Sequence, residues 1–404
     1  MTTTLTSRAP TTGAPHGRQR RAHPSRAITL GLVAVLAGVV LVTEATGDAS
    51  ERQATTLAGP AAETAPTRPV EAASPPRVPA HAPPTSVADV PAHSGELRVQ
   101  PQRLAPSPPA DGRDAPDPAV VHDGGRWALF STQVGHLNVP VALSDDLRRW
   151  SRPIDALPRL PDWAEWGHTW APGVLPRDDG FVLYFAARSE ALGLQCIGVA
   201  TAPTIQGPYT SPAPKPFVCQ PQLGGSIDPQ PFVDADGTAY LLWKADSNAI
   251  GRTSQLFAQR LRPDGLALAG APVTLLLSDA EWEWPLIENP AMLAADGLAT
   301  GGRYLLFYSG GWWESEGYAT GYALCDTPLG PCEKRTTGQP ALASTGDEAG
   351  TGGASVMTGP DGDQWLAYHA WKPRTVGYDT GGARTLHFAS LDWRSNELVV
   401  TREH

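Results

Sequence analysis

The feature that most constrains the fold is a unit that recurs about every 50–65 residues from Asp114 to the C-terminus. In each unit a turn rich in Asp and Gly precedes a short run of aromatic and β-branched residues, as in Asp234–Gly237 before Thr238–Trp243. Asp-Gly sequences accept the positive φ that tight hairpin turns need, and such runs are typical of strands. The sequence shows no sustained apolar period of about 3.6 residues, so we expect few helices.

Five such units can be counted, and they open at Asp117, Trp170, Asp228, Glu288 and Gly352. Four-stranded units repeated around an axis form a β-propeller. The sequence therefore predicts an all-β protein in which residues 111–404 form a five-bladed β-propeller. A β-sandwich or a β-helix is the alternative, although a sandwich does not require self-similar units.

Residues 1–47 have the composition of an export or anchor segment. A basic cluster at Arg18–Arg21 precedes an apolar run from Ala27 to Val42, which is about 16 residues long. That length lies between a signal peptide's apolar region and a membrane span, and the basic flank places the rest of the chain outside the cytoplasm. We therefore expect an extracellular protein, either secreted or held on the outer face of the cytoplasmic membrane by a single-pass anchor.

Residues 48–110 have the composition of a linker. They hold 13 of the chain's 41 prolines, together with many Ala, Thr and Ser residues. Such a segment buries too little apolar surface to offset its ordering entropy, and it favours extended polyproline conformations. We expect a disordered stalk that spaces a monomeric catalytic domain from a membrane or wall.

Charge and cysteine content narrow the partners and the compartment. The formal net charge is −10, and no basic cluster follows residue 26. We therefore expect no nucleic-acid partner, whereas a neutral polysaccharide or oligosaccharide is compatible. Four cysteines in an exported chain favour disulfides, and we expect the sequence-local pairs Cys196–Cys219 and Cys325–Cys332. Four free thiols are the alternative, and the lack of a Cys-x-x-Cys spacing argues against zinc.

Three carboxylates mark the openings of units one, three and four: Asp117, Asp228 and Glu288. Each is followed at once, or one residue later, by Pro and an apolar run. The innermost strand of each blade lines the axis of a propeller, so we expect these acids to converge at one mouth of the channel. Burial and like-charge proximity would move their pKa values apart, which gives the acid and base that glycosidic-bond hydrolysis needs. The alternative is local, because Asp before Pro also stabilises turns.

These openings resemble those of glycoside hydrolase family 43, the five-bladed β-propeller arabinosidases and xylosidases. The resemblance covers about Asp114 to His404. It rests on four motifs: Asp117-Pro118, Trp170-Ala171-Pro172, Ser226-Ile227-Asp228-Pro229 and Glu288-Asn289-Pro290-Ala291. It implies an inverting hydrolase of arabinofuranosyl or xylosyl linkages in plant-type polysaccharides.

The resemblance also implies roles for the three acids. Asp117 would be the general base, Glu288 the general acid, and Asp228 the residue that tunes the pKa of the acid and orients it. Inversion predicts that the carboxyl groups of Asp117 and Glu288 stand roughly 6.5–9.5 Å apart.

Further residues are candidates for binding substrate or metal. Trp170 and His168 lie at the opening of the second unit, where an indole can stack on a sugar and an imidazole can bond a hydroxyl. The alternative is core packing for Trp170 and a structural role for His168. Arg384 is a candidate charge partner for an acid, with a surface role as the alternative. The chemistry requires no cofactor. The resemblance implies a structural Ca²⁺ ion in the central channel near a His, and Gly353 stands where that His is often found, which leaves His369 as the candidate.

Two other functions fit the same pattern. A propeller that binds carbohydrate without turnover would also explain the tryptophans and the stalk. A retaining hydrolase of fructosides would use a carboxylate nucleophile in place of the general base. The anomer formed first distinguishes retention from inversion, and turnover distinguishes an enzyme from a binding module.

Overall fold

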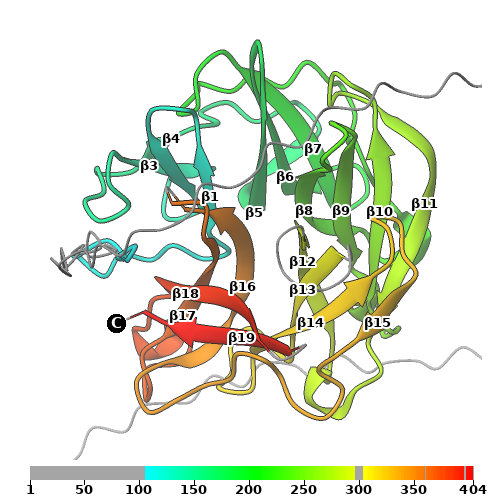
Figure 1. The fold of residues 1–404 in the computed structure, drawn as a ribbon. Helices are drawn as coiled ribbons and strands as arrows, with labels where there is room; N and C mark the ends of the chain where they lie inside the picture. Colours follow the sequence, from blue (N-terminus) through cyan, green and yellow to red (C-terminus); the bar gives the residue numbers. More distant parts are fainter. Residues whose placement is uncertain (1–104, 296–303, 360, 395–396, 404) are drawn as a thin grey trace, which may run out of the picture. The chain divides into compact units, whose positions relative to one another are not determined.

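Five antiparallel sheets surround a common axis in the computed structural model, which describes residues 105–295, 304–359, 361–394 and 397–403 (Figure 1). Each sheet follows the order of its strands in the chain, and its first strand lies nearest the axis. The first strands of successive sheets contact one another, and the contact of the fifth sheet with the first closes the ring. This arrangement is the predicted five-bladed β-propeller.

The blades use consecutive stretches of chain. The strands of blade 1 are β1 (Ala119–His122), β2 (Trp127–Phe130), β3 (Pro140–Ser144) and β4 (Ile154–Asp155). Those of blade 2 are β5 (Ala164–Arg177), β6 (Gly180–Ser189) and β7 (Gln195–Ala202). Those of blade 3 are β8 (Ser226–Val233), β9 (Ala239–Ala245), β10 (Gln255–Leu261) and β11 (Leu268–Leu277). Those of blade 4 are β12 (Ile287–Ala294), β13 (Tyr304–Gly310), β14 (Ala319–Cys325) and β15 (Cys332–Lys334). Those of blade 5 are β16 (Ala349–Thr358), β17 (Gln364–Trp371), β18 (Thr385–Arg394) and β19 (Glu397–Arg402).

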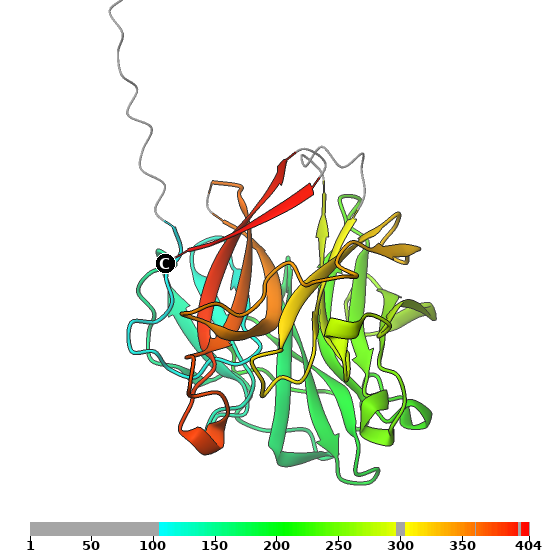
Figure 2. The same ribbon diagram turned by 90° about the horizontal axis from the view of Figure 1, so that it is seen from below.

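The helices of the described residues are single 3₁₀ turns, as the absence of a helical period predicts. They are η1 (Pro221–Leu223), η2 (Ser247–Ile250), η3 (Glu281–Glu283) and η4 (Tyr378–Thr380). The loops that carry η2 and η4 lie on the same face of the propeller, at the lower edge of Figure 2. Long connections between strands therefore lie on that face, where they can surround a binding site.

Blade 2 departs from the expected four strands. After β7 the chain makes only two isolated bridges to it, Ile197 with Val218 and Thr201 with Thr210. The intervening segment contains Pro212, Pro214 and Pro216. Proline has no N–H to donate to a ladder, so a regular fourth strand cannot form here.

The core consists of apolar clusters between neighbouring blades. Phe130 of blade 1 packs with Leu183 and Phe185 of blade 2, and comparable clusters fill the other four interfaces. The cluster between blades 5 and 1 includes Leu129 and Phe388, so the same burial that joins consecutive blades also joins the two ends of the ring. Hydrophobic burial between blades therefore holds the inner strands, and the residues on them, in a fixed circle.

Both expected disulfides are present. Cys196 is bonded to Cys219 across blade 2, and Cys325 is bonded to Cys332 between β14 and β15. The predicted pairing is therefore confirmed, and none of the four cysteines is free.

The segment before β1 joins the propeller earlier than the composition suggests. The Ser107 N–H donates to the carbonyl of Leu147, and the Trp150 indole donates to the carbonyl of Ser107. Residues 105–110, which the composition assigns to the linker, thus contact blade 1. The rest of the linker and the apolar run 27–42 lie outside the described residues, among which no helix is long and apolar enough to cross a membrane.

Candidate active site

A left-handed residue lies within the innermost strand of blades 2 to 5 and two residues before it in blade 1. These five residues have φ between 41° and 61°: Asp117, Ala171, Asp228, Asn289 and Gly353. In blades 2 to 5 the pairing with the second strand shifts at this point, as in a β-bulge. Non-glycine residues rarely adopt positive φ, so the four that do carry backbone strain of a kind found at functional sites.

This ring of bulges corrects the alignment of the repeats. Three of the predicted openings are wrong by one residue. The residues equivalent to Asp117 and Asp228 are Ala171, Asn289 and Gly353, and not Trp170, Glu288 and Gly352. Glu288 lies one residue earlier, still paired with Ser309 of β13. Because the bulge changes the direction of the chain between these two positions, Glu288 approaches the axis differently from the aspartates.

Side chains of the preceding blade satisfy the backbone N–H groups of these bulges. Four bonds do so: Ala171 N–H to Thr132 Oγ1 at 2.7 Å, Asn289 N–H to Asp228 Oδ2 at 2.9 Å, Gly353 N–H to Ser309 Oγ at 2.9 Å, and Asp117 N–H to His369 Nδ1 at 3.0 Å. Buried N–H groups require partners, so each bond ties a strained bulge to its neighbour. The acids are thereby anchored between blades.

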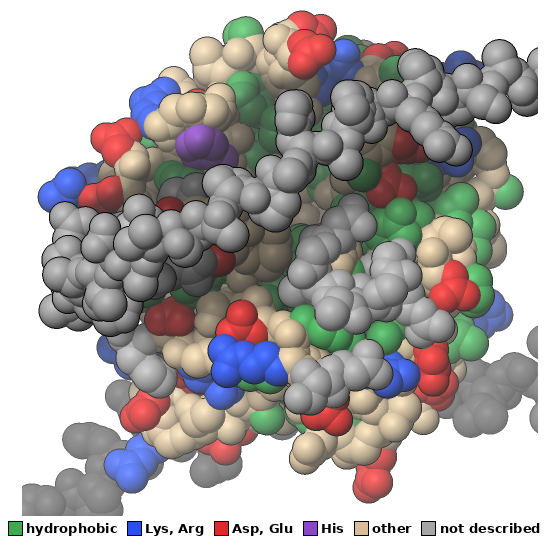
Figure 3. All heavy atoms as spheres, viewed as in Figure 1, with side chains coloured by type: hydrophobic (Ala, Val, Ile, Leu, Met, Phe, Trp, Pro, Cys, Tyr) green, Lys and Arg blue, Asp and Glu red, His purple; other side chains and the backbone are tan. Residues whose placement is uncertain are grey.

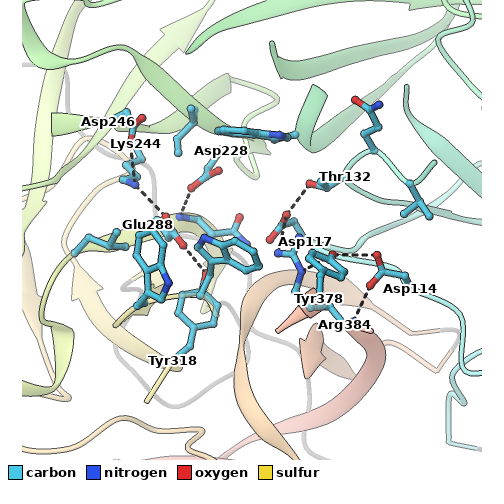
Figure 4. A pocket seen from close by; sticks show the side chains of 18 of the residues that line it. Asp114, Asp117, Thr132, Asp228, Lys244, Asp246, Glu288, Tyr318, Tyr378 and Arg384 are labelled. Carbon is cyan, nitrogen blue, oxygen red and sulfur yellow. Dashed lines mark hydrogen bonds and ion pairs between the residues drawn. The ribbon is translucent and has the colours of Figure 1, made fainter. Parts of the chain in front are cut away.

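The three acids line one cavity of about 530 Å³ (Figure 4). Trp170 and Arg384 line the same cavity. His168 does not; its side chain is about one-third exposed, 3.8 Å from Glu165 and edge-on to Trp170. The structure therefore brings together five of the predicted site residues and leaves His168 just outside.

Asp117 is held through one of its carboxylate oxygens. The Thr132 hydroxyl donates to Oδ2 at 2.6 Å, and Arg384 Nη1 lies 3.6 Å from the same atom. The Thr132 hydroxyl already accepts the Ala171 N–H, so its proton is directed to Asp117. Both contacts are of a kind that a carboxylate accepts, and they hold Asp117 beside a fixed hydroxyl and a fixed guanidinium.

Glu288 is held through both oxygens. Lys244 Nζ lies 3.0 Å from Oε2, and the Tyr318 hydroxyl donates to Oε1 at 2.9 Å. Lys244 is 1% exposed and also lies 3.2 Å from Asp246 Oδ1. Burial alone would lower the pKa of Lys244, but the surrounding carboxylates, first of all Glu288, raise it above its usual value. The surrounding carboxylates therefore favour the charged form of Lys244 beside Glu288.

Asp228 is the most buried of the three acids. It is 7% exposed and accepts the N–H of Asn289. Burial, followed by the nearby charge of Glu288, raises the pKa of Asp228 well above the ordinary value for aspartate. The three acids therefore share one cavity but differ in burial and in hydrogen-bond partners, and such different environments are what acid–base chemistry requires.

Arg384 is fixed by aromatic rings. Its guanidinium carbon lies 4.7 Å from the ring centroid of Trp313, and Trp371 and Tyr378 flank it. Its Nε donates to the Tyr378 hydroxyl at 3.1 Å, and its backbone N–H donates to Asp114 at 2.7 Å. Cation–π contacts and hydrogen bonds hold the charge beside the cavity without neutralising it.

His369 does not fit direct coordination of a cation. It is fully buried, and burial lowers its pKa well below the usual value, so the ring is neutral. Nδ1 accepts the Asp117 N–H, so the ring proton is on Nε2, and neither nitrogen has a free lone pair. The ring also fills the space that a side chain on Gly353 would need. Across the described ranges no three His, Cys, Asp or Glu side chains gather into a metal site.

Sequence reasoning missed several residues of the cavity. Lys244, Tyr318, Thr132 and Tyr378 all contact a predicted site residue. Lys244 had a readable signal, because it interrupts the apolar run Ala239–Ala245 of a buried strand, where lysine is rare unless paired. The others are ordinary residues of loops and strands and carry no such signal.

Residues 109–399 match the family model described as Glycosyl hydrolases family 43. The chain belongs to this family. It is similar to the extracellular exo-α-(1→5)-L-arabinofuranosidase ArbA of Cellvibrio japonicus (strain Ueda107), with 25% identity over 265 residues, 60% of this chain and 71% of that protein. It is also 37% identical to xylosidase/arabinosidase 43A of Humicola insolens over 92 residues, which are 22% of this chain and 26% of that protein.

A solved structure supports the membership. The crystal structure of a thermostable family-43 glycoside hydrolase superposes with a TM-score of 0.63 and 28% identity, covering 72% of this chain and 95% of that one. This family 43 chain is therefore a glycoside hydrolase of the propeller type, and the resemblance inferred from its motifs is confirmed.

Proposed function

We propose that this family 43 chain cleaves arabinofuranosyl or xylosyl linkages in neutral, plant-type polysaccharides with inversion. One observation supports the proposal above all: Asp117, Asp228 and Glu288 line a single cavity in three different environments. Asp117 faces donors and a cation, Glu288 is held at both oxygens, and Asp228 is buried. Different environments allow carboxyl groups to take different roles at one pH.

In the proposed reaction Asp117 is the general base. It removes a proton from a water molecule, whose oxygen forms a bond to the anomeric carbon. Glu288 gives its proton to the glycosidic oxygen as the bond from that oxygen to the anomeric carbon breaks. Asp228 holds the backbone beside Glu288, and the acid and base return to their starting forms by exchange with solvent.

The surface of the cavity suits a neutral sugar. Trp170, Trp312 and Trp313 line it, and indole faces stack well on the C–H faces of sugar rings. Charged side chains of both signs lie on the opposite face of the propeller, which Figure 3 shows, whereas the cations that line the cavity, Lys244 and Arg384, each lie beside an acid. The two relatives named above carry arabinofuranosidase or xylosidase names, which supports the same substrate class.

The proposal includes an extracellular location. Two disulfides fit an oxidising compartment, and the C. japonicus relative is named as extracellular. Secretion and a single-pass anchor are both consistent with the apolar run 27–42. A monomeric state and a structural Ca²⁺ ion stay predictions.

The test is release of reducing sugar from arabinan, arabinoxylan and p-nitrophenyl pentosides. Glu288→Ala and Asp117→Ala should each abolish release while leaving the thermal melt nearly unchanged. Asp162→Asn, which alters an acid that is 94% exposed, is the matched control and should keep full activity. Full activity in both active-site variants would refute the proposed roles.

Proton NMR of the first-formed product tests the stereochemistry. Inversion predicts the anomer opposite to that of the substrate. Retention would mean that a carboxylate attacks the sugar as a nucleophile, which would contradict the role proposed for Asp117. Binding of sugar without any turnover across the panel would mark a carbohydrate-binding propeller instead.

A further inference from the structure

Lys244 is a buried cation that the proposed mechanism does not use. It lies in β9 of blade 3, is 1% exposed, and points into the cavity between Asp246 and Glu288 (Figure 4). Burying an ammonium is costly unless it is paired, so a lysine in this strand requires a specific reason. Its contact with Glu288 crosses from one blade to the next.

The chemistry of the two partners of Glu288 differs. An ammonium has three donors and no lone pair, whereas a phenol hydroxyl both donates and accepts. Lys244 at 3.0 Å from Oε2 is therefore compatible only with an oxygen that accepts from it. Tyr318 at 2.9 Å from Oε1 can turn its hydroxyl when that oxygen carries a proton.

Other charged or titratable groups surround Glu288 from every side. Asp228 belongs to β8, Asp246 follows β9, Tyr318 precedes β14, and Asp117 lies across the cavity. Among the described residues that line the cavity, Lys244 and Arg384 are the cations, and Arg384 pairs with Asp117. Lys244 is therefore the cation that contacts the proposed acid.

We propose that Lys244 is a positioning residue for the acid: its ammonium fixes Oε2 of Glu288, so that Oε1, beside Tyr318, carries the proton delivered to the leaving group. This inference rests on the proposed function. It predicts that the loss of Lys244 impairs proton delivery specifically, and that attack by water is affected much less.

Leaving groups of different basicity separate these two effects. Hydrolysis of an unactivated pentose disaccharide needs a proton on the leaving oxygen, whereas 2,4-dinitrophenolate leaves without one. Lys244→Met should lower kcat/KM at least about 100-fold for the disaccharide and less than about fivefold for the 2,4-dinitrophenyl pentoside, because general-acid catalysis typically contributes about 10²–10⁴-fold. Equal losses on both substrates would overturn the inference.

The pH profile supplies a second readout that a purely structural role would not move. Without the neighbouring positive charge, the acid keeps its proton to higher pH, so the alkaline limb of kcat/KM should move up by about one pH unit or more in Lys244→Met. Lys244→Arg retains the charge and should keep the limb within about 0.3 units of wild type. A limb that does not move in Lys244→Met would contradict the proposal.

Tyr318→Phe tests the other oxygen, and it keeps the proposal open to refutation if the Lys244 variants fold poorly. It should also slow the disaccharide more than the dinitrophenyl substrate, and a thermal melt close to wild type shows that the fold is intact. An equal effect of Tyr318→Phe on both substrates would show that Oε1 of Glu288 does not deliver the proton to the leaving group. If the wild-type protein cleaves neither substrate, the proposed function is wrong. If it cleaves both, and neither variant shows a dependence on the leaving group, only the inference about Lys244 is wrong.

Discussion

Asp228 in blade 3 accepts a hydrogen bond of 2.9 Å from the backbone N–H of Asn289 in blade 4, the residue that follows Glu288. A side chain of one blade thus fixes the backbone from which the proposed acid of the next blade extends. The same carboxyl group is buried, and its pKa is raised first by burial and then by the charge of Glu288. Position and electrostatics therefore connect these two acids.

Asp228→Asn should reduce activity without reducing stability. A carboxyl group whose pKa is raised in the folded state favours folding less and less as pH rises above its unfolded value, near 3.8, through the higher folded value. An amide avoids that loss and still accepts the Asn289 N–H. We therefore expect a melting temperature at pH 7 equal to or above that of wild type.

The expected loss of kcat/KM for Asp228→Asn on an arabinoside or xyloside is at least about 100-fold, because the variant loses the carboxyl group beside the proposed acid. The measurements are a thermal melt and initial rates at pH 7. A variant that melts well below wild type would show that the carboxyl group of Asp228 is needed for folding.

His369→Phe should destabilise the protein and weaken activity together. The phenyl ring keeps the volume but removes Nδ1, so the buried N–H of Asp117 loses its acceptor. An unsatisfied buried donor costs about 1–3 kcal/mol of unfolding free energy. Urea unfolding checks this value, and His168→Phe, which alters a partly exposed histidine, is the control expected within about 0.5 kcal/mol of wild type. Equal effects of the two variants would show that the hydrogen bond from the Asp117 N–H to His369 does not contribute to stability.

Gly353→Ala separates backbone strain from steric overlap. Gly353 has φ 61°, and a Cβ there would overlap the His369 ring and approach Asp117 Oδ1. Gly362 also has positive φ, at 82°, but no atom lies within 4 Å of its Cβ position. Gly362→Ala should therefore cost about 1–2 kcal/mol from strain alone, whereas Gly353→Ala should cost at least about 1 kcal/mol more. Similar costs by urea unfolding would show that the His369 ring moves freely.

The sequence predicted the ring of sheets because the repeat is local in the chain. Each Asp-Gly turn and the aromatic strand after it can be recognised on its own. Every blade must bury its apolar faces against two neighbours, and a closed ring satisfies this requirement for all five blades. Asp117 and Asp228 were found for the same reason, since each opens a unit before Pro. The exact register was not readable: only the backbone shows that Asn289, and not Glu288, occupies the bulge.

Residues contributed by a neighbouring blade could not be predicted from one sequence. The bond of His369 to Asp117 spans 252 positions, and that of Lys244 to Glu288 spans 44. Neither pair has a fixed spacing that a motif could record. The missing fourth strand of blade 2 is different, because its cause is visible in the sequence. Prolines 212, 214 and 216 lack the backbone N–H groups that a strand donates to its neighbour.

A buried ionic cluster in blade 5, whose residues do not line the cavity, makes the stability of the protein sensitive to acid. Glu348 accepts bonds from Arg402 Nε at 2.9 Å and the Tyr368 hydroxyl at 2.8 Å, and His387 Nδ1 lies 3.1 Å from its other oxygen. Burial by itself raises the pKa of Glu348, but these partners, led by His387, outweigh it and lower the pKa to about 2. The cluster ties β19, the last strand, to the blade.

Glu348→Gln should therefore reduce stability at pH 7 but much less at low pH. A carboxyl group with a lowered folded pKa contributes stability that is complete above its unfolded value, near 4.5, and is lost as pH falls from there toward about 2. We expect a loss of about 3 kcal/mol at pH 7 in urea unfolding, because the variant breaks a buried pair. The difference from wild type should narrow steadily below pH 4.5. Glu333→Gln, which alters a side chain that is 69% exposed, should stay within about 0.5 kcal/mol of wild type at both pH values, and a Glu348→Gln difference that does not change with pH would contradict the charged state assigned to this carboxylate.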